Sequence, residues 1–308
     1  NSLWVRPLDS SVARPLPGTE NPSLPFWSPD GRFIGFFADG KLKRIDTFGE
    51  PPLTICDAPV PRGGAWNRDG VILFSPVTDG PLYRVDASGG KPTAVTKLDA
   101  KRGESSHRWP VFLPDGKRFL YLVASFGVPR EGTGIYVGSL DSKEETFLVR
   151  AGANAAYAPP GYLVYFREGN LLAQRLDAKI ERVEGPPFAL AEDIQFFPQQ
   201  QAALFSASSN GVLVSQPRSN TSVSQLTWLD RSGKVLGTLG PPANQSNPRI
   251  SPDGAEEVLK KGRYVRSSPV NDRVNKDHAY WESADVDGDG MVGYMRQQCA
   301  EVAVVDRA

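Results

Sequence analysis

Trp27-Ser28-Pro29-Asp30-Gly31 is followed directly by the apolar run Arg32-Phe33-Ile34-Gly35-Phe36-Phe37, and this combination decides the fold. Serine suits the first position of a tight turn, proline presets φ at the second, aspartate tolerates the third, and glycine supplies a positive φ at the exit. The aromatic and β-branched run is typical of a buried strand. The stretch therefore predicts a β-hairpin.

The same turn recurs along the chain, as Trp66-Asn67-Arg68-Asp69-Gly70, Leu113-Pro114-Asp115-Gly116, Ala158-Pro159-Pro160-Gly161, Ser208-Ser209-Asn210-Gly211 and Ser251-Pro252-Asp253-Gly254. Successive final glycines are 39 to 50 residues apart, which matches the roughly 40 to 50 residues of a four-stranded propeller blade. The turn residues Asp30, Gly31, Asp69, Gly70, Asp115, Gly116, Asp253 and Gly254 are assigned structural roles. We predict an all-β fold, a β-propeller of four-stranded blades.

The chain between residues 1 and 254 accounts for six blades. Five complete units are expected, at about 24–56, 64–98, 107–149, 154–192 and 202–240. Residues 2–16 supply only a third and fourth strand, and residues 245–254 supply only a first strand, so a composite sixth blade could close the ring. The alternative is a piece of a longer propeller with free edges.

The repeated pattern of W-S-P-D-G, an apolar strand, L-x-x-I-D and G-G resembles the WD40-like PD40 repeats of TolB-like β-propellers. The stretches 25–40 and 106–116 are especially similar to the propeller that follows bacterial receptor-type serine/threonine protein kinases. This resemblance implies a sensor or scaffolding module in an extracytoplasmic location. It specifies the fold better than the function, because related propellers serve many functions.

Residues 255–308 differ from the repeats and are expected to lie outside the propeller. They contain both methionines and only one of the 27 prolines. Residues 255–261, Ala-Glu-Glu-Val-Leu-Lys-Lys, favour a helix where the repeat requires a strand. A second small module, a disordered tail and an artefactual join in the reading frame each explain the change.

Asp285, Asp287 and Asp289 have the spacing of the first ligands of a calcium loop, with Gly290 at its sixth position. Position 12 is Arg296 instead of the bidentate glutamate. A solvated turn is therefore favoured over a calcium site. No other cofactor is expected, and cation binding by the ring of turn carboxylates is the weaker alternative to their turn role.

Composition excludes several classes of partner. Lys plus Arg number 35, as do Asp plus Glu, so no basic field points to nucleic acid. No apolar run is long enough to span a membrane, although the absence of an initial methionine suggests a fragment and leaves room for an upstream anchor. Cys56 and Cys299 are too isolated to predict a disulfide framework or a zinc site.

Catalytic motifs are few. The chain has no G-x-S-x-G nucleophile elbow and no kinase loop. His107, within His107-Arg108-Trp109, could line the channel as part of a ligand site, although a structural role is favoured. The tryptophans Trp27, Trp66 and Trp109 could stack on a ligand, but packing between blades is favoured.

These observations predict a non-enzymatic propeller that binds a protein or a small molecule through its loops and central funnel. The alternatives are a propeller hydrolase or lyase with its active site in the channel, or the propeller of a serine peptidase that lacks its catalytic domain. A purely structural piece of a larger protein is a third class.

Overall fold

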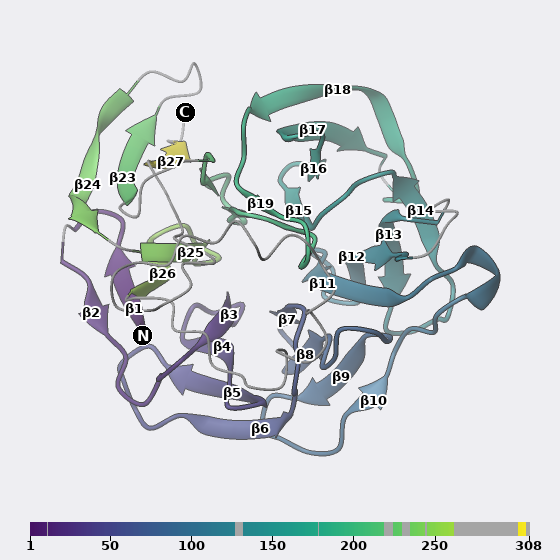
Figure 1. Ribbon diagram of the computed structural model, residues 1–308, viewed down its shortest axis with the longest axis horizontal. Helices are drawn as coiled ribbons and strands as arrows, with labels where there is room; N and C mark the ends of the chain where they lie inside the picture. Colours follow the sequence, from purple (N-terminus) through teal and green to yellow (C-terminus); the bar gives the residue numbers. More distant parts are fainter. Residues whose placement is uncertain are drawn as a thin grey trace, which may run out of the picture.

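The structure, a computed structural model, describes residues 1–10, 12–126, 132–177, 179–218, 224–229, 235–243, 245–261 and 301–305. These residues form a ring of β-sheets around a central axis (Figure 1). The described sheets are five of four strands and one of five strands, together with a two-stranded hairpin. The predicted all-β propeller is therefore confirmed. The one helix in these ranges, the 3-10 helix η1 (Ala100–Arg102), is far too short to cross a bilayer.

The first four blades are antiparallel meanders in which each strand pairs with the next along the chain. The first two consist of β3 (Ser23–Trp27), β4 (Phe33–Ala38), β5 (Lys41–Asp46) and β6 (Leu53–Asp57), then β7 (Gly64–Trp66), β8 (Val71–Phe74), β9 (Tyr83–Asp86) and β10 (Thr93–Ala94). The next two consist of β11 (Ser106–Phe112), β12 (Arg118–Ala124), β13 (Gly134–Ser139) and β14 (Thr146–Val149), then β15 (Ala155–Ala158), β16 (Tyr162–Arg167), β17 (Asn170–Leu176) and β18 (Val183–Ala191).

The fifth sheet includes a strand from the C-terminal part of the chain. Its order is β21 (Phe205–Ala207), β22 (Leu213–Ser215), β27 (Glu301–Val305), β23 (Ser224–Leu229) and β24 (Val235–Ala243). A short hairpin of β19 (Phe196–Phe197) and β20 (Ala202–Ala203) precedes this sheet. In Figure 1 this hairpin extends toward the centre of the ring.

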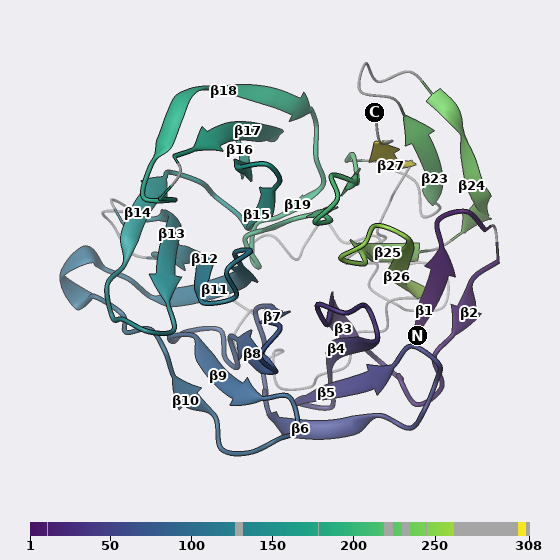
Figure 2. The same ribbon diagram turned by 180° about the vertical axis from the view of Figure 1, so that it is seen from behind.

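Both ends of the propeller contribute to the sixth blade, which has the order β2-β1-β26-β25. The N-terminal part supplies β1 (Ser2–Pro7) and β2 (Arg14–Pro15), and the later part supplies β25 (Gln245–Ile250) and β26 (Glu256–Lys261). All six residues of β1 pair with β26 in an antiparallel register, from Ser2↔Lys261 to Pro7↔Glu256. The pairing closes the ring, as Figures 1 and 2 show from its two sides.

The helix predicted for residues 255–261 is corrected by the structure, because β26 occupies this stretch. The predicted domain boundary after Gly254 consequently falls inside the sixth blade. Helix propensity is a weak preference that tertiary pairing overrides. Here β26 has a hydrogen-bonding partner on each side, and Val258 is fully buried with Leu3 and Val5 of β1.

The recurring turns have the expected local geometry. The φ angles of Gly31, Gly70, Gly116 and Gly254 lie between 66° and 79°, a range that favours glycine. Where the turn has an aspartate before the glycine, the carboxylate usually accepts backbone N–H bonds from the following residues, as for Asp30, Asp115 and Asp253. In the second blade Asn67 accepts these backbone bonds in place of the aspartate, since its Oδ1 accepts from the amides of Asp69 and Val71.

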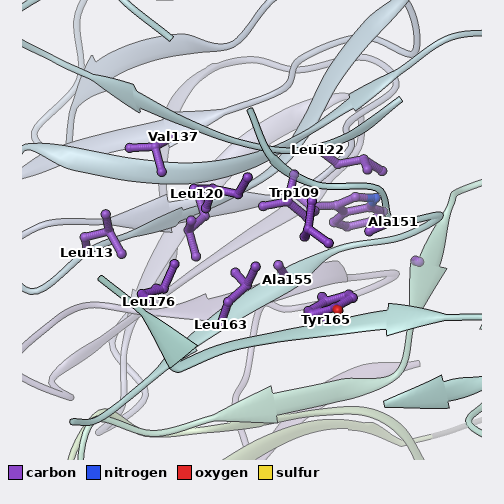
Figure 3. Close-up of a cluster of buried hydrophobic side chains, with 14 residues drawn as sticks. Trp109, Leu113, Leu120, Leu122, Val137, Ala151, Ala155, Leu163, Tyr165 and Leu176 are labelled. Atoms are coloured by element: carbon purple, nitrogen blue, oxygen red, sulfur yellow. The ribbon is translucent and has the colours of Figure 1, made fainter. Parts of the chain in front are cut away.

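The core lies mainly between neighbouring blades. One cluster joins the third and fourth blades, with Trp109, Leu120 and Leu122 facing Leu163 and Tyr165 (Figure 3). The interface between the sixth and first blades is built in the same way from Leu3 and Val5 against Trp27, Ile34 and Phe36. Each blade therefore depends on its neighbours for burial of its apolar faces.

Candidate functional site

The innermost strands of all six blades surround a channel along the axis of the ring. Strands β3, β7, β11, β15, β21 and β25 each contact the next, and β25 contacts β3. The channel has a volume of about 610 Å³, which lies within the range of about 300–1,000 Å³ that is typical of small-molecule sites. Its wall also includes several of the recurring turns, such as Pro29, Pro114 and Pro252.

The wall of the channel is mostly apolar. Its aromatic members come from five blades and are Phe26, Trp27, Trp66, Trp109, Phe112, Tyr157 and Phe205. Its charged members are two arginines, Arg68 and Arg249, and the described lining residues include no aspartate or glutamate. The channel therefore combines aromatic surface with positive charge.

Arg249 is held on the innermost strand β25 by bonds to both neighbouring blades. Its Nη1 donates to the carbonyl oxygen of Phe205 at 2.7 Å, and its own carbonyl accepts from Trp27 Nε1 at 3.0 Å. No carboxylate among the described residues lies within ion-pair distance of its guanidinium. Burial lowers the pKa of Arg249 to about 10, still high enough for the group to be charged at neutral pH.

Asn154 supplies an oriented amide to the same channel. Its Oδ1 accepts from the backbone N–H of Ala203 at 2.7 Å, so its Nδ2 faces the other way, and this nitrogen has no hydrogen-bond partner in the described ranges. Ser206 is a further polar lining residue, with its hydroxyl 3.4 Å from the amide nitrogen of Ile250.

The β19–β20 hairpin is hydrogen-bonded to the channel wall. The carbonyl of Gln200, at its tip, accepts from Trp109 Nε1 at 3.1 Å and from Arg108 Nη1 at 3.2 Å. Trp109 lines the channel, whereas Gln200 does not. The hairpin therefore contacts the channel wall at Trp109 and does not itself line the channel.

The three residues predicted to contact a ligand, His107, Arg108 and Trp109, have different environments. Trp109 lines the channel. His107 is fully buried, with Nδ1 2.7 Å from Thr96 Oγ1 and Nε2 3.2 Å from Glu104 Oε2. A ligand role for the His107-Arg108-Trp109 stretch stays a prediction, and within it Trp109 alone borders the channel.

Arg108 is also fully buried, and its hydrogen bonds go to neutral groups. It donates to Ser106 Oγ and to the carbonyls of Gln200 and Thr78. Burial and the nearby positive charge of Arg62 lower the pKa of Arg108 to about 10. These contacts give Arg108 a structural role between the inner strand and the hairpin.

Glu104 and His107 belong to a buried polar network. Arg102 donates to Glu104 at 2.8 Å and also pairs with Glu145, which accepts from Tyr121 OH at 2.8 Å. Burial alone would raise the pKa of Glu104, but hydrogen bonds from His107, the Asp99 amide and Arg102 outweigh it, so the pKa lies below its ordinary value of 4.5.

Replacing Glu104 by glutamine is expected to destabilise the protein at neutral pH by about 1–3 kcal/mol, because buried donors lose a charged acceptor. A carboxyl with a lowered folded-state pKa stabilises above its unfolded pKa, and this contribution is lost as the pH falls through the folded pKa. The difference in melting temperature between wild type and E104Q should therefore be constant near neutral pH and shrink in acid. A difference that grows in acid would contradict this assignment.

The three tryptophans that precede the turns contribute to packing and to the channel. Trp27 and Trp109 are only 8% and 6% exposed and belong to the interblade clusters. Trp66 stacks on Phe33 of the first blade, with ring centres 6.0 Å apart. All three also line the channel, so packing and ligand contact are compatible roles.

Sequence reasoning missed Arg249 and Asn154. One signal was present: in the repeat Phe26 and Ala65 occupy the position of Arg249, two before the turn residues Ser28, Asn67 and Ser251. A charged residue at an inner-strand position that is otherwise uncharged is the pattern that could have pointed to the channel.

The described residues do not fit a metal site. No group of three His, Cys, Asp or Glu side chains with metal-binding geometry occurs among them, and carboxylates, which calcium prefers, are missing from the described channel wall. The predicted calcium ligands Asp285, Asp287 and Asp289 lie outside the described residues.

Comparison with known proteins supports the fold. No protein-family profile matches the chain. It is 27% identical over 273 residues to an uncharacterized protein of Agrobacterium fabrum, covering 80% of this chain and 85% of that protein. A TolB-like protein from Agrobacterium tumefaciens superposes with a TM-score of 0.60 at 22% identity, covering 85% of this chain and 98% of the other.

Two further structures carry functional names. A gluconolactonase from Xanthomonas campestris superposes with a TM-score of 0.55 at 15% identity, covering 77% of this chain and 85% of the other. A calcium-binding regucalcin from Agrobacterium tumefaciens gives 0.52 at 16% identity, covering 79% and 92%. At these identities the likeness shows a shared propeller fold.

The prediction that the chain is not an enzyme is corrected by these comparisons. It rested on missing kinase and hydrolase motifs, yet a gluconolactonase is among the proteins that share this propeller fold. The absence of those motifs therefore does not exclude catalysis on such a scaffold, in agreement with the rule that function resides in sites and not in folds.

Proposed function

We propose that this protein is a propeller that takes up a small molecule in its central channel. The observation that carries the proposal is the channel itself, a cavity of about 610 Å³ walled by aromatic side chains from five blades and a few oriented polar groups. Such a combination is typical of small-molecule sites. Trp27, Trp66 and Trp109 offer rigid contact surface for an apolar or aromatic body.

A channel-filling substitution tests this location. Ala156 lies on β15 and lines the channel, whereas Ala94 lies on the outermost strand β10 and is exposed. Compounds that raise the melting temperature of the wild type, drawn from aromatic acids, their amides and lactones, should bind A156F about tenfold more weakly or worse, a loss of about 1.4 kcal/mol. A94F should bind them as the wild type does. Unchanged binding to a folded A156F would place the site elsewhere.

A second candidate is hydrolysis of a cyclic ester in the same channel. The shared fold with a gluconolactonase supports it, and lactone opening yields a hydroxy acid whose carboxylate suits a positively charged wall. The direct test is acid release from glucono-lactone by the full chain, with and without added calcium, beside A156F. Release at the uncatalysed rate would remove this substrate from consideration.

The roles implied by the PD40 resemblance stay predictions. They are a sensor or scaffolding role with a protein or small-molecule partner, an extracytoplasmic location and a link to a receptor-type kinase. A channel ligand is compatible with a sensor role, because a sensor must bind the molecule that it detects.

A further inference from the structure

The geometry points to an organic anion with an apolar body as the ligand of the channel, bound through its carboxylate by Arg249 with Asn154 as a neutral donor. This inference rests on the proposed channel site and specifies its ligand class.

The charge of the wall is unbalanced. Arg249 reaches one carbonyl, that of Phe205, and no carboxylate in the described ranges lies within ion-pair distance. Arg249 is partly buried, and a charge shielded from water is unfavourable unless a partner compensates it. Since the described wall of the channel holds no aspartate or glutamate, the missing counter-charge is readily supplied by a ligand.

The two donors are oriented by one stretch of backbone. Asn154 Oδ1 accepts from the amide of Ala203, and Arg249 Nη1 donates to the carbonyl of Phe205, two residues further on. These bonds leave Asn154 Nδ2, Arg249 Nε and Arg249 Nη2 without partners among the described residues. Asn154 and Arg249 thus flank the same short segment, and both line the channel.

The surrounding surface selects the rest of the ligand. Phe205 and Trp27, the residues bonded to Arg249, are themselves aromatic lining residues. Charged groups that arginine recognises well are carboxylates and phosphates. Arg249 is the partly buried arginine of this aromatic channel, whereas Arg68 is exposed. One shielded positive charge favours a monoanion such as an aryl or alkyl carboxylate over a multiply charged phosphate, which would keep uncompensated charge in an apolar site.

The test compares matched acids and amides on the full chain. Benzoate, phenylacetate, indole-acetate and octanoate are each titrated beside the corresponding primary amide by calorimetry and thermal shift. The wild type is expected to bind at least one acid about tenfold or more tightly than its amide. In R249Q this preference should vanish. In N154D, which keeps the bond from the Ala203 amide but adds a negative charge that offsets that of Arg249, the preference should likewise be lost.

Control variants separate charge from folding. R175Q removes the same charge from an exposed position of β17 and should keep the preference for acids. R249M should fold with an unchanged or higher melting temperature, because it removes a partly buried charge that has no carboxylate partner among the described residues. A purely structural Arg249 would instead make R249M less stable. A destabilised R249M that leaves acid binding intact would overturn the inference.

The outcomes distinguish the two proposals. If acids and amides bind the wild type equally and A156F blocks both, the channel site stands and the anion inference fails. If neither series binds the wild type, and no lactone does, both proposals fail together. If R249Q keeps the preference for acids, the carboxylate is bound elsewhere and the role of Arg249 is wrong.

Discussion

Replacing Arg6 by methionine is expected to destabilise the fold by about 3–5 kcal/mol, because it removes the guanidinium that pairs with a buried carboxylate. Arg6 lies on β1 and Glu257 is opposite it on β26. The two side chains are 2% and 0% exposed, and Arg6 Nε donates to Glu257 Oε1 at 2.7 Å. Arg6 Nη1 also lies 3.5 Å from the carbonyl oxygen of Leu239 in the fifth sheet.

The measurement is urea unfolding followed by circular dichroism at neutral pH. The double variant R6M/E257L should recover most of the lost stability, because exchange of a buried ion pair for apolar side chains is often neutral. K41M provides the matched control: Lys41 pairs with Asp57, but these side chains are 45% and 80% exposed, so a loss of no more than about 1 kcal/mol is expected. An R6M loss as small as that of K41M would show that the pair does not secure the closure.

A chain that ends at Gly254 is expected to lose cooperative unfolding, whereas a chain that ends at Lys261 keeps its sixth blade. The shorter chain lacks β26, which lies between β1 and β25. Without it β1 and β25 have no common neighbour, Val258 no longer fills the cluster around Leu3 and Val5, and Arg6 has lost Glu257. Exposed strand edges of this kind promote association between chains.

Calorimetry and size-exclusion chromatography of the two chains decide this prediction. We expect a sharp transition and a monomer for the longer chain, and a broad transition or aggregates for the shorter one. Because both chains lack β27, its removal from the fifth sheet cannot explain a difference between them. Equal melting of the two chains would mean that β26 is dispensable for closure.

The structure agrees best with the sequence-based predictions where the sequence signal is local. In the turn around Asp30 the hydroxyl of Ser28 and the carboxylate of Asp30 bond to groups within five residues, so the local residue pattern carries the information. The period of these turns then predicts the blades. By contrast β26 has a helix-favouring composition, and only its pairing with β1 makes it a strand.

The candidate site was less predictable because its members are far apart in sequence. Arg249 contacts Phe205, 44 residues away, and Trp109 contacts Gln200, 91 residues away. A motif search detects residues at fixed short spacing, so His107 and the aspartates of 285–289 attracted attention and Arg249 did not.

Turn chemistry and apolar periodicity are properties of short stretches, and they were enough to specify an all-β propeller with four-stranded blades. Ring closure, the buried Arg6–Glu257 pair across 251 residues and a described channel wall free of acidic side chains emerge only when distant strands meet. Their energies come from desolvation and from pairing between segments brought together by the fold, and no local pattern in the chain encodes which partner each segment will find.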